Sequence, residues 1–334
     1  MDHRLQDPDT LTIELLQVYG HGIRHGHYSR QPSVRADSVA TAWRAIAETH
    51  LLEGLPDPRK RPGSSAKDLD KRLSRMTRHY SLQDPPPRRE KAIPLGLVIF
   101  IGGQADTSPK AQCTADLIQI GLFFCLRSCE YTKSASHRRT TQFRLQDMQF
   151  HNKDGVIPGD APDQAFLDAW AVTLFLDTQK NCVRGESTSM EATGLQHGDA
   201  VSAAARRFIH LRANSATPDT PICTYYTSHG STPSSIPSRH ITTTLRKAAQ
   251  KLGFQKLGFH PHEIGSHSLR SGGAMTLHLA GVPEHTIKII GRWRSDAFLI
   301  YLQGQIATFT QGVAAAMAKV RWFKHTTAPS LPHP

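Results

Sequence analysis

The chain has 334 residues, enough for two domains, and 38% of them are apolar, enough to build hydrophobic cores. Lysine and arginine total 40 against 28 aspartates and glutamates, and the net charge of +12 favours a polyanionic partner, most commonly nucleic acid. A basic protein without such a partner stays open on charge alone. No apolar run approaches the roughly 18 residues of a membrane helix, and no apolar signal region follows Met1, so we expect a soluble intracellular protein.

Cysteine and histidine usage argues against a disulfide framework and a metal site. The five cysteines are odd in number, and no pair has the CxxC spacing of redox or zinc motifs. The 19 histidines are scattered, and His260, His262 and His267 lack the second ligand pair that a structural metal requires. The sequence therefore predicts no metal and no other cofactor.

Residues 1–82 have the apolar spacing of a helical domain. A first helix from about residue 11 should end near Gly20. In the second, apolar residues at 39, 42, 43 and 46 share one face, and Asp37 or Ser38 is the expected N-cap. A third helix should cover 68–79, after a basic loop.

The loop and the third helix carry a run of basic side chains. They are Arg59, Lys60, Arg61, Lys71, Arg75 and Arg78. Residues three or four apart on a helix share a face. A solvated helix face and a stripe that follows a phosphate backbone are equally consistent with this pattern.

Three consecutive prolines, Pro85 to Pro87, mark the clearest linker, because consecutive prolines forbid helix and favour an extended spacer. The sequence thus predicts a first domain over 1–82, a linker over 83–92, a second domain over 93–324 and a tail over 325–334.

The second domain mixes helices with a few strands. A helix over 111–126 is apolar on all sides and should be buried. Strands are expected at 141–150 and 169–176, and a third strand or a tail is expected to run towards 193. Further helices are expected over 199–213, 238–252, 269–280, 283–290, 296–302 and 307–322. The predicted fold class is α+β, mostly helical, with one small antiparallel sheet.

Several polar residues in this domain could carry chemistry. His267 and Arg270 are three apart at a helix start, so both can reach one bound anion. Arg127 follows an apolar run and is costly to bury unpaired, and Glu130 stands three residues on to hold it. Tyr301 lies in an apolar helix, where a lone tyrosine is usually a core residue.

The order of these residues resembles the active-site series of the tyrosine recombinase (phage integrase) family. The series reads Arg127-x-x-Glu130, Lys180 in a strand turn, His267-x-x-Arg270, Gly291-Arg292-Trp293 and Tyr301. The sequence segments that contain these residues are similar to those of mobile-element members of the family, such as Crypton or DIRS-like elements. The match covers most of residues 92–322. The N-terminal helices resemble the family's DNA-clamping domain through their helices and charge alone.

The resemblance implies DNA strand transfer through a 3′-phosphotyrosyl bond to Tyr301. Arg127 and Arg270 would bind the phosphate oxygens as planar forks. His267 would donate to the phosphate or accept the tyrosine proton. Trp293 would donate its indole N–H, or simply pack in the core. Glu130 would orient Arg127 or His267.

A lysine would protonate the leaving 5′-oxygen in this scheme. Lys180 is the preferred candidate by resemblance to the family's hairpin, and Lys153 in the preceding turn is its competitor.

The implied partner is double-stranded DNA, bound by a homotetramer on two sites, with no membrane or small-molecule substrate. Besides the basic loop and helix of the first domain, Arg138, Arg139, Arg206 and Arg207 are candidates for backbone contacts. Residues 307–322 would dock on a neighbouring subunit or cap the chain's own core. The protein would act where the DNA is, in the nucleus of a eukaryote or the nucleoid of a prokaryote.

Two departures from the family keep alternatives open. Trp293 and Tyr301 are eight residues apart where many members have nine, and the N-terminal part has fewer helices than is usual, as in a fragment of a longer gene. A domesticated, inactive DNA-binding protein, a type IB topoisomerase and a basic helical interaction protein are the alternatives.

Overall fold

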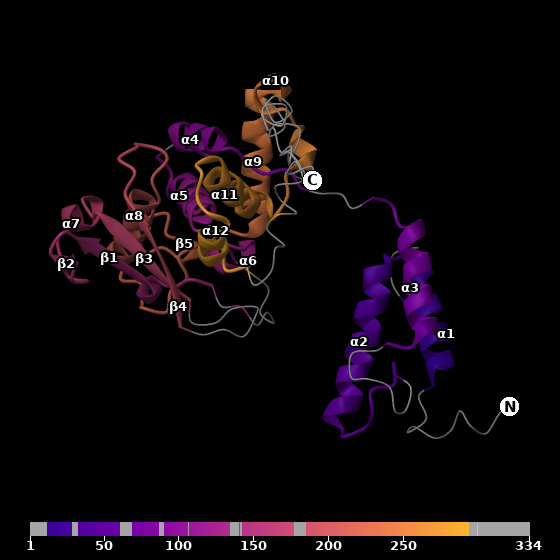
Figure 1. Ribbon diagram of the computed structural model, residues 1–334. Coiled ribbons are helices and arrows are strands. Elements are labelled where there is room, and N and C mark those ends of the chain that lie inside the picture. The colour runs from indigo at the N-terminus through magenta and orange to yellow at the C-terminus, as the bar shows by residue number, and fades with distance from the viewer. Residues whose placement is uncertain are drawn as a thin grey trace, which may run out of the picture. The chain divides into compact units, whose positions relative to one another are not determined.

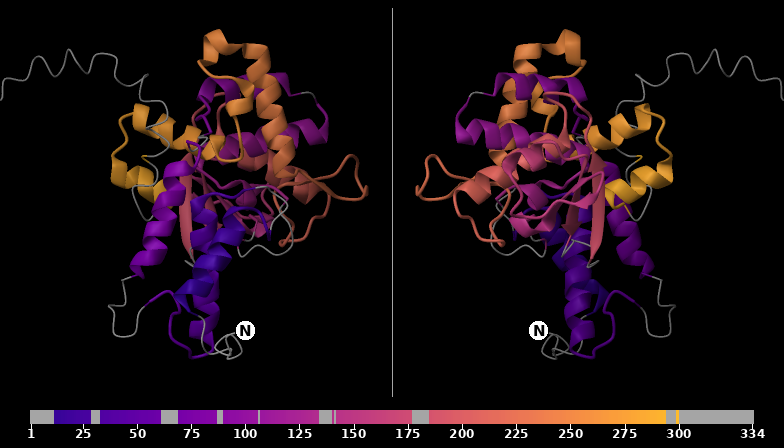
Figure 2. Two further views of the ribbon diagram at one scale, coloured as in Figure 1. Left: turned by 90° about the vertical axis from the view of Figure 1, so that its right-hand side faces the viewer. Right: turned by 90° about the vertical axis from the view of Figure 1, so that its left-hand side faces the viewer.

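The computed structural model describes residues 12–28, 33–60, 69–86, 90–105, 107–133, 140, 142–176, 185–293 and 299. The chain forms two compact units, Met1–Arg88 and Arg89–Pro334 (Figures 1 and 2). The division falls inside the segment 83–92 that the sequence assigns to a linker. Within the described ranges, no helix is both long enough and apolar enough to cross a membrane.

The described part of the first unit consists of α1 (Ile13–Arg24), α2 (Ala36–Leu52) and α3 (Lys71–Gln83). Trp43 is its central side chain, 1% exposed and packed with Leu16 and Leu73. The indole N–H donates to the carbonyl of Leu16 at 2.8 Å, which satisfies its polar atom inside the core. The three helices therefore share one small apolar core centred on this ring.

Helix α1 continues past Gly20 to Arg24, so the predicted end near Gly20 is wrong. A Cβ at Gly20 would lie 2.4 Å from an atom of the Trp43 ring. The glycine is present because the indole packs directly on the helix backbone, and it does not end the helix.

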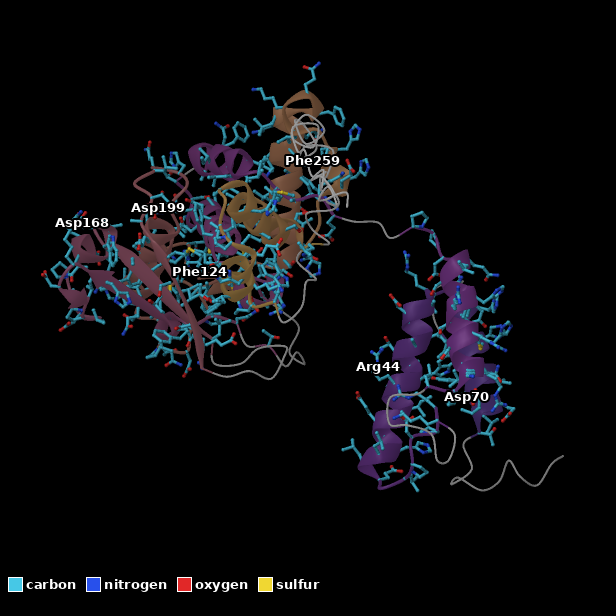
Figure 3. The ribbon with its side chains drawn as sticks, in the orientation of Figure 1. Arg44, Asp70, Phe124, Asp168, Asp199 and Phe259 are labelled. Carbon is cyan, nitrogen blue, oxygen red and sulfur yellow. The ribbon has the colours of Figure 1, made fainter. Side chains whose placement is uncertain are left out.

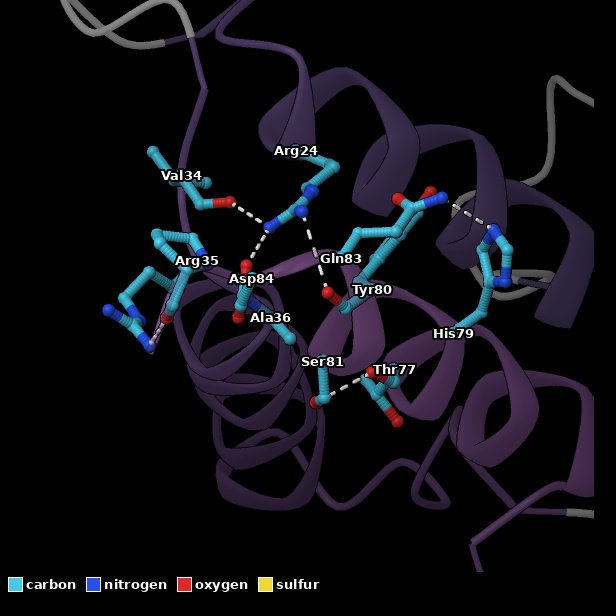
Figure 4. Close-up of polar contacts among 11 residues, drawn as sticks. Arg24, Val34, Arg35, Ala36, Thr77, His79, Tyr80, Ser81, Gln83 and Asp84 are labelled. Carbon is cyan, nitrogen blue, oxygen red and sulfur yellow. Dashed lines mark hydrogen bonds and ion pairs between the residues drawn. The ribbon is translucent and has the colours of Figure 1, made fainter. Parts of the chain in front are cut away.

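Arg24 joins the ends of the three helices (Figure 4). Its guanidinium donates to the carbonyl of Val34 at 2.7 Å and forms an ion pair with Asp84. It also lies 5.2 Å from the centroid of the Tyr80 ring. The hydrogen bond from Arg24, followed by one from the backbone of Ala36, lowers the pKa of Asp84. One cation and one anion are thus balanced at this contact.

The cap of α2 comes from a distant residue. The helix begins at Ala36, and its N-cap residue, Arg35, makes no side-chain cap bond. Instead, the Ala36 N–H donates to Asp84 at 2.9 Å. The prediction that Asp37 or Ser38 is the N-cap is therefore wrong. Asp84 is the C-cap residue of α3, which ends at Gln83 and so extends beyond its predicted end at residue 79.

The second unit is mostly helical. Its longer helices are α4 (Leu95–Gln104), α5 (Pro109–Phe123), α8 (Ala200–Ala213), α9 (Ser238–Leu252), α11 (Ser268–Leu279) and α12 (Glu284–Gly291). Short helical turns are α6 (Ser128–Tyr131), η2 (Leu145–Asp147), α7 (Asp163–Leu167), α10 (Phe254–Leu257) and η3 (Pro261–Glu263). Every residue from Cys113 to Leu122 is buried, so α5 is the buried helix that the sequence predicts. Ser108 caps it through the N–H of Ala111.

One antiparallel sheet has the order β2–β1–β3–β4, formed by β1 (Met148–Asn152), β2 (Gly155–Val156), β3 (Ala171–Leu176) and β4 (Glu186–Glu191). Phe150 pairs with Val172, and Val172 pairs with Met190. Helix α8 packs against β3 and β4, and it is capped by Asp199 (Figure 3). A hairpin of β5 (Thr224–Tyr225) and β6 (Ser234–Ser235) completes the described strands. The predicted α+β class, mostly helical with a small antiparallel sheet, is confirmed.

The first strand begins later than the sequence predicts, at Met148 in place of residue 141. The preceding residues form the η2 turn, closed by Asp147, which accepts from the backbone N–H of Arg144 at 2.8 Å and from its guanidinium at 3.1 Å. This local carboxylate–guanidinium pair competes with strand pairing, so the strand begins only after the turn.

Two consecutive glycines let α11 approach the centre of the unit. A Cβ at Gly272 would lie 2.3 Å from the carbonyl oxygen of Ile93, and one at Gly273 would lie 2.2 Å from that of Leu122. Any side chain would push α11 away from the end of α5. Ile93 also donates to the carbonyl of Ser268 at 3.2 Å. With Ala92 also buried, the second unit begins within the predicted linker.

Candidate active site

The first part of the site lies where α5 ends. Phe124, labelled in Figure 3, is fully buried, and Cys125 follows in the left-handed conformation with φ 47°. This turn leads to Arg127, the N-cap residue of α6. Its backbone N–H donates to one carboxylate oxygen of Glu130 at 2.8 Å, and its Nη1 donates to the other at 3.0 Å. Glu130 is 1% exposed and holds Arg127, as their spacing predicts.

Arg270 comes to the same place from the first turn of α11. It is 2% exposed and donates to the carbonyls of Cys125 and Gly291. Its guanidinium carbon lies 4.3 Å from the centroid of the Trp293 ring. Arg270 therefore connects three segments, the end of α5, the start of α11 and the end of α12.

Trp293 folds back over the end of α12. A Cβ at Gly291 would lie 1.6 Å from a Trp293 ring atom, so the glycine is required for this approach. The ring is half-buried and also packs against the small core of α11 and α12. Trp293 therefore has the packing role that was one of its two predicted roles, and its ring also lies on the Arg270 guanidinium.

A third arginine, Arg292, belongs to this cluster although the sequence analysis assigned it no role. It is the C-cap residue of α12, and its Nη2 donates to Glu130 at 2.8 Å. Glu130 thus binds Arg127 and Arg292, and none of its contacts among the described residues is with His267. The sequence signal that could have identified Arg292 is its charge, because it stands between an apolar helix and a tryptophan.

The cluster has an excess of positive charge. Three guanidiniums, of Arg127, Arg270 and Arg292, surround the single carboxylate of Glu130, which leaves two positive charges unbalanced. The pKa of Arg270 is lowered to about 10, first by burial and then by the charges of Arg127 and Arg292, while the charge of Glu130 acts in the opposite direction. Arg270 still carries its charge at neutral pH. Such a site favours an anion, and guanidinium forks match the oxygens of a phosphate.

His267 lies next to this cluster in the chain, as the N-cap residue of α11, with an exposed side chain. Its backbone N–H donates to Glu90 at 2.6 Å. Glu90 fits there because Gly265 has no side chain, since a Cβ at that position would lie 1.9 Å from the carboxylate. The carboxylate beside His267 was not predicted, because it lies 177 positions away in the sequence.

Several predicted site residues lie outside the described residues. They are Tyr301, Lys180, Arg61, Arg138 and Arg139, together with the predicted helix over 307–322. Lys153, the competitor of Lys180, is described and exposed in the β1–β2 turn. This hairpin lies at the edge of the sheet far from α6 and α12 in Figure 1.

The predicted DNA-backbone residues of the first unit divide into two groups. Lys71, Arg75 and Arg78 are all exposed on α3. Arg59 and Lys60, in contrast, both bind the carboxylate of Asp57, at 2.8 and 3.6 Å. The hydrogen bond from Arg59 is the main cause that lowers the pKa of Asp57 to about 2.

Arg207 was wrongly predicted to contact DNA. It is 2% exposed, and its guanidinium donates to the carbonyls of Ile222 and Thr224 inside the unit. Its neighbour Arg206 forms an ion pair with the buried Asp116 at 2.7 Å. Both guanidiniums hold α8 to the rest of the unit, and neither is a free cation for a ligand.

A second basic cluster, not foreseen from the sequence, lines a cavity of about 560 Å³ at the start of α9. Lys110, Lys133, Arg239 and His240 contribute to its wall, beside Ser234 and Ser235 of the β6 strand. Burial, then the charges of Lys110 and Lys247, lower the pKa of His240. The residues come from four places in the sequence, so no local motif marks them.

No metal site emerges from the described part of the chain, where no three histidine, cysteine or acidic side chains gather as metal ligands. Cys113, Cys125, Cys129 and Cys223 are free thiols. Burial raises the pKa of Cys113 to about 12 and that of Cys125 to about 11, so these thiols are unreactive packing residues.

No family model and no curated protein matches the chain. Among solved structures, it is similar to XerA recombinase, with 14% identity, a TM-score of 0.40, and coverage of 96% of this chain and 87% of that chain. The Tn1549 transposon integrase in complex with a circular intermediate DNA has 14% identity, a TM-score of 0.47, and coverage of 95% and 90%. XerH site-specific recombinase bound to its difH substrate has 12% identity, a TM-score of 0.44, and coverage of 92% and 78%. Matches with these TM-scores and identities do not assign a function to the chain. A functional assignment therefore depends on the geometry of its own side chains.

Proposed function

We propose that the protein is a DNA strand-transfer enzyme of the tyrosine recombinase type. The observation that carries the proposal is the convergence of Arg127 and Arg270, 143 positions apart in the sequence, around one buried carboxylate with two positive charges in excess. A structural ion pair would be balanced, whereas a phosphodiester supplies the anion that this cluster lacks. The same residues and Trp293 occupy the positions that the family resemblance assigns to phosphate binding.

The proposed reaction is a transesterification. The Tyr301 oxygen attacks the phosphorus and forms a 3′-phosphotyrosyl bond, while the bond from phosphorus to the 5′-oxygen breaks. The leaving oxygen takes a proton and becomes a 5′-hydroxyl. A 5′-hydroxyl of a second strand then reverses the step, so the phosphate ester is conserved without ATP.

The chain's residues divide this work. Arg127 and Arg270 stabilise the charge that develops on the non-bridging oxygens, an effect worth about 3 kcal/mol for each donor in a dry site. His267, exposed at the start of α11, donates to the phosphate or accepts the Tyr301 proton. Trp293 lies against Arg270 and adds its indole N–H.

Two observations support the roles proposed for Tyr301 and Lys180. Leu299, two positions before Tyr301, packs against the small core of α11 and α12, the helices that carry Arg270 and Arg292. We assign the leaving-group proton to Lys180 in the β3–β4 connection, because its competitor Lys153 lies in the hairpin at the far edge of the sheet.

DNA binding in this proposal uses surfaces of both units. The exposed face of Lys71, Arg75 and Arg78 and the basic cavity at the start of α9 supply phosphate contacts that carry no sequence information. The active assembly would be a homotetramer on two DNA sites in the compartment that holds the DNA, with integration or excision of a mobile element as its biological context.

The test is covalent trapping on a nicked duplex taken from the DNA that flanks the coding sequence. The wild-type chain should form an adduct that resists SDS, and Tyr301→Phe should form none. Tyr28→Phe, which changes an exposed tyrosine of the first unit, is the matched control and should retain the adduct.

Other results would favour the alternatives. DNA binding without an adduct would favour a DNA-binding protein that has lost the chemistry. Relaxation of supercoiled plasmids without strand exchange would favour a topoisomerase. Absence of both binding and adduct would contradict any DNA function.

A further inference from the structure

Arg292 occupies a backbone position that suits glycine better than arginine. It ends α12 in the left-handed conformation, with φ 55° and ψ 45°. Residues with a Cβ adopt this conformation at a cost of about 1 kcal/mol, which is why glycine is usual at helix ends. The described residues include only three non-glycine positions with positive φ, namely Cys125, Ser215 and Arg292. Two of these three lie in the arginine cluster.

The side chain of Arg292 explains its place. From the end of α12 it reaches Glu130, 162 positions earlier in the sequence, with its side chain only 3% exposed. The oxygen of Glu130 that Arg292 binds is the one that accepts the backbone N–H of Arg127. Arg292 and Arg127 therefore hold the carboxylate together, and loss of Arg292 would leave Arg127 as its single charged partner.

The remaining donors of Arg292 distinguish it from the structural arginines of this protein. Its Nε and Nη1 are buried and have no acceptor among the described residues. Arg207, equally buried, donates to two carbonyls, and Arg206 and Arg24 each have a carboxylate. A buried donor without an acceptor destabilises the fold by about 1–3 kcal/mol. An arginine kept only for stability would not combine this with a strained backbone.

We propose that Arg292 is a positioning residue of the anion site, which acts on Arg127 through Glu130 and adds the third positive charge of the cluster. The identity of the anion as a DNA phosphate rests on the proposed function. Arg292 does not touch the phosphate in this proposal. Its removal should therefore impair the chemical step more than the binding of DNA.

Three variants separate positioning from folding. Arg292→Met keeps the length of the side chain and removes its charge, Arg292→Lys keeps the charge, and Arg292→Gly relieves the left-handed backbone. The matched control is Arg212→Met, which removes a partly buried, carboxylate-paired arginine that contacts Gly159, Ala161 and Asp163 on the sheet side of the same unit.

The first measurement is the single-turnover rate of adduct formation at saturating DNA, beside the Kd for DNA. Arg292→Met and Arg292→Gly should lower the rate by about 10- to 100-fold, because misplaced catalytic groups have effects of this size, with the Kd changed by less than about 3-fold. Arg292→Lys should recover most of the rate. A rate per folded molecule unchanged in Arg292→Met, or a lysine variant no better than methionine, would overturn the proposal.

The second measurement does not need strand transfer. Inorganic phosphate should raise the Tm of the wild-type chain and of Arg212→Met, but raise it less in Arg292→Met, with Arg292→Lys between them. If no adduct forms with wild type while this pattern holds, the strand-transfer proposal fails and the role of Arg292 stands. If phosphate raises the Tm of wild type and Arg292→Met equally, or of neither, the role assigned to Arg292 is wrong.

Discussion

Two buried arginine contacts in this protein differ in their charge balance. In the first unit, Arg24 meets one carboxylate, Asp84, and two backbone carbonyls, and none of its nitrogens is a buried donor without an acceptor. In the second unit, Glu130 is the single carboxylate among three arginines, of which Arg127 and Arg292 bind it, and two donor atoms of Arg292 have no acceptor among the described residues. The balanced contact holds helices together, whereas the unbalanced one has positive charge in excess, which is the basis of the proposed anion site.

The largest effect should come from Arg270→Lys, which breaks the unbalanced cluster. A single ammonium cannot replace a fork that donates to Cys125 and Gly291 and still reaches a phosphate. We expect adduct formation to slow by about 100- to 1000-fold in single-turnover trapping. Arg212→Lys is the control and should keep the wild-type rate. Equal rates for Arg270→Lys and wild type would mean that the cluster is structural.

Gly273→Ala tests whether packing holds the unbalanced cluster together. The added methyl would lie 2.2 Å from the Leu122 carbonyl oxygen, so α11 must shift away from the end of α5 that accepts from Arg270. We expect a loss of about 1–3 kcal/mol in the free energy of unfolding, measured by urea denaturation. Gly96→Ala in α4, where nothing lies within 4 Å of the new methyl, should cause no such loss.

The exposed stripe on α3 sharpens the comparison, because its side chains are exposed and form no ion pair with another described residue. Replacing Lys71, Arg75 and Arg78 together by alanine should weaken DNA binding and flatten the slope of log K against log salt by about 3, as each phosphate contact contributes about one. Arg72→Ala removes a guanidinium on the same helix that binds Glu14 and Asp70. This control should leave the slope nearly unchanged, and an equal change in both variants would argue against a DNA-facing stripe.

The smallest effect should come from the balanced contact in acid. The pKa of Asp84 is lowered in the folded chain, chiefly by Arg24. Its stabilisation is therefore complete above the ordinary carboxyl value of 3.8 and is lost as the pH falls through the lowered folded-state value. Protection factors for hydrogen exchange in α1 and α2, which correct for the pH dependence of intrinsic amide exchange, should fall over this acid range in the wild type. Those of Asp84→Asn should be lower at neutral pH and should respond less to pH. An identical pH response in both would remove Asp84 from the account.

Much of the fold followed from local patterns. The buried α5, the bounds of α9, and the mixture of helices with a small antiparallel sheet were predicted from periodicity and turn residues. The pairing of Arg127 with Glu130 also followed from their spacing, since residues three apart can meet within one turn. These features depend on neighbours in sequence, so the sequence is enough to find them.

The errors have the opposite character. Gly20 was interpreted as a helix end because the Trp43 ring that packs on it lies 23 positions away, and the cap of α2 was missed because Asp84 lies 48 positions away. Arg207 was assigned to DNA because its acceptors, the carbonyls of Ile222 and Thr224, carry no mark in the sequence. Each is a contact between segments that only folding brings together.

The sequence by itself determined the order of the chemical blocks, the basic charge of the chain and the fold class, because these reside in residue types and their spacing. Only the tertiary structure decided which arginines and lysines are exposed and which bind carboxylates or carbonyls inside the fold. It also placed Arg292 beside Glu130, 162 positions away in the sequence. The physical reason is that charge balance depends on which groups lie close together in space. A carboxylate neutralises whichever guanidinium lies within a few ångströms, however far apart the two stand in the chain.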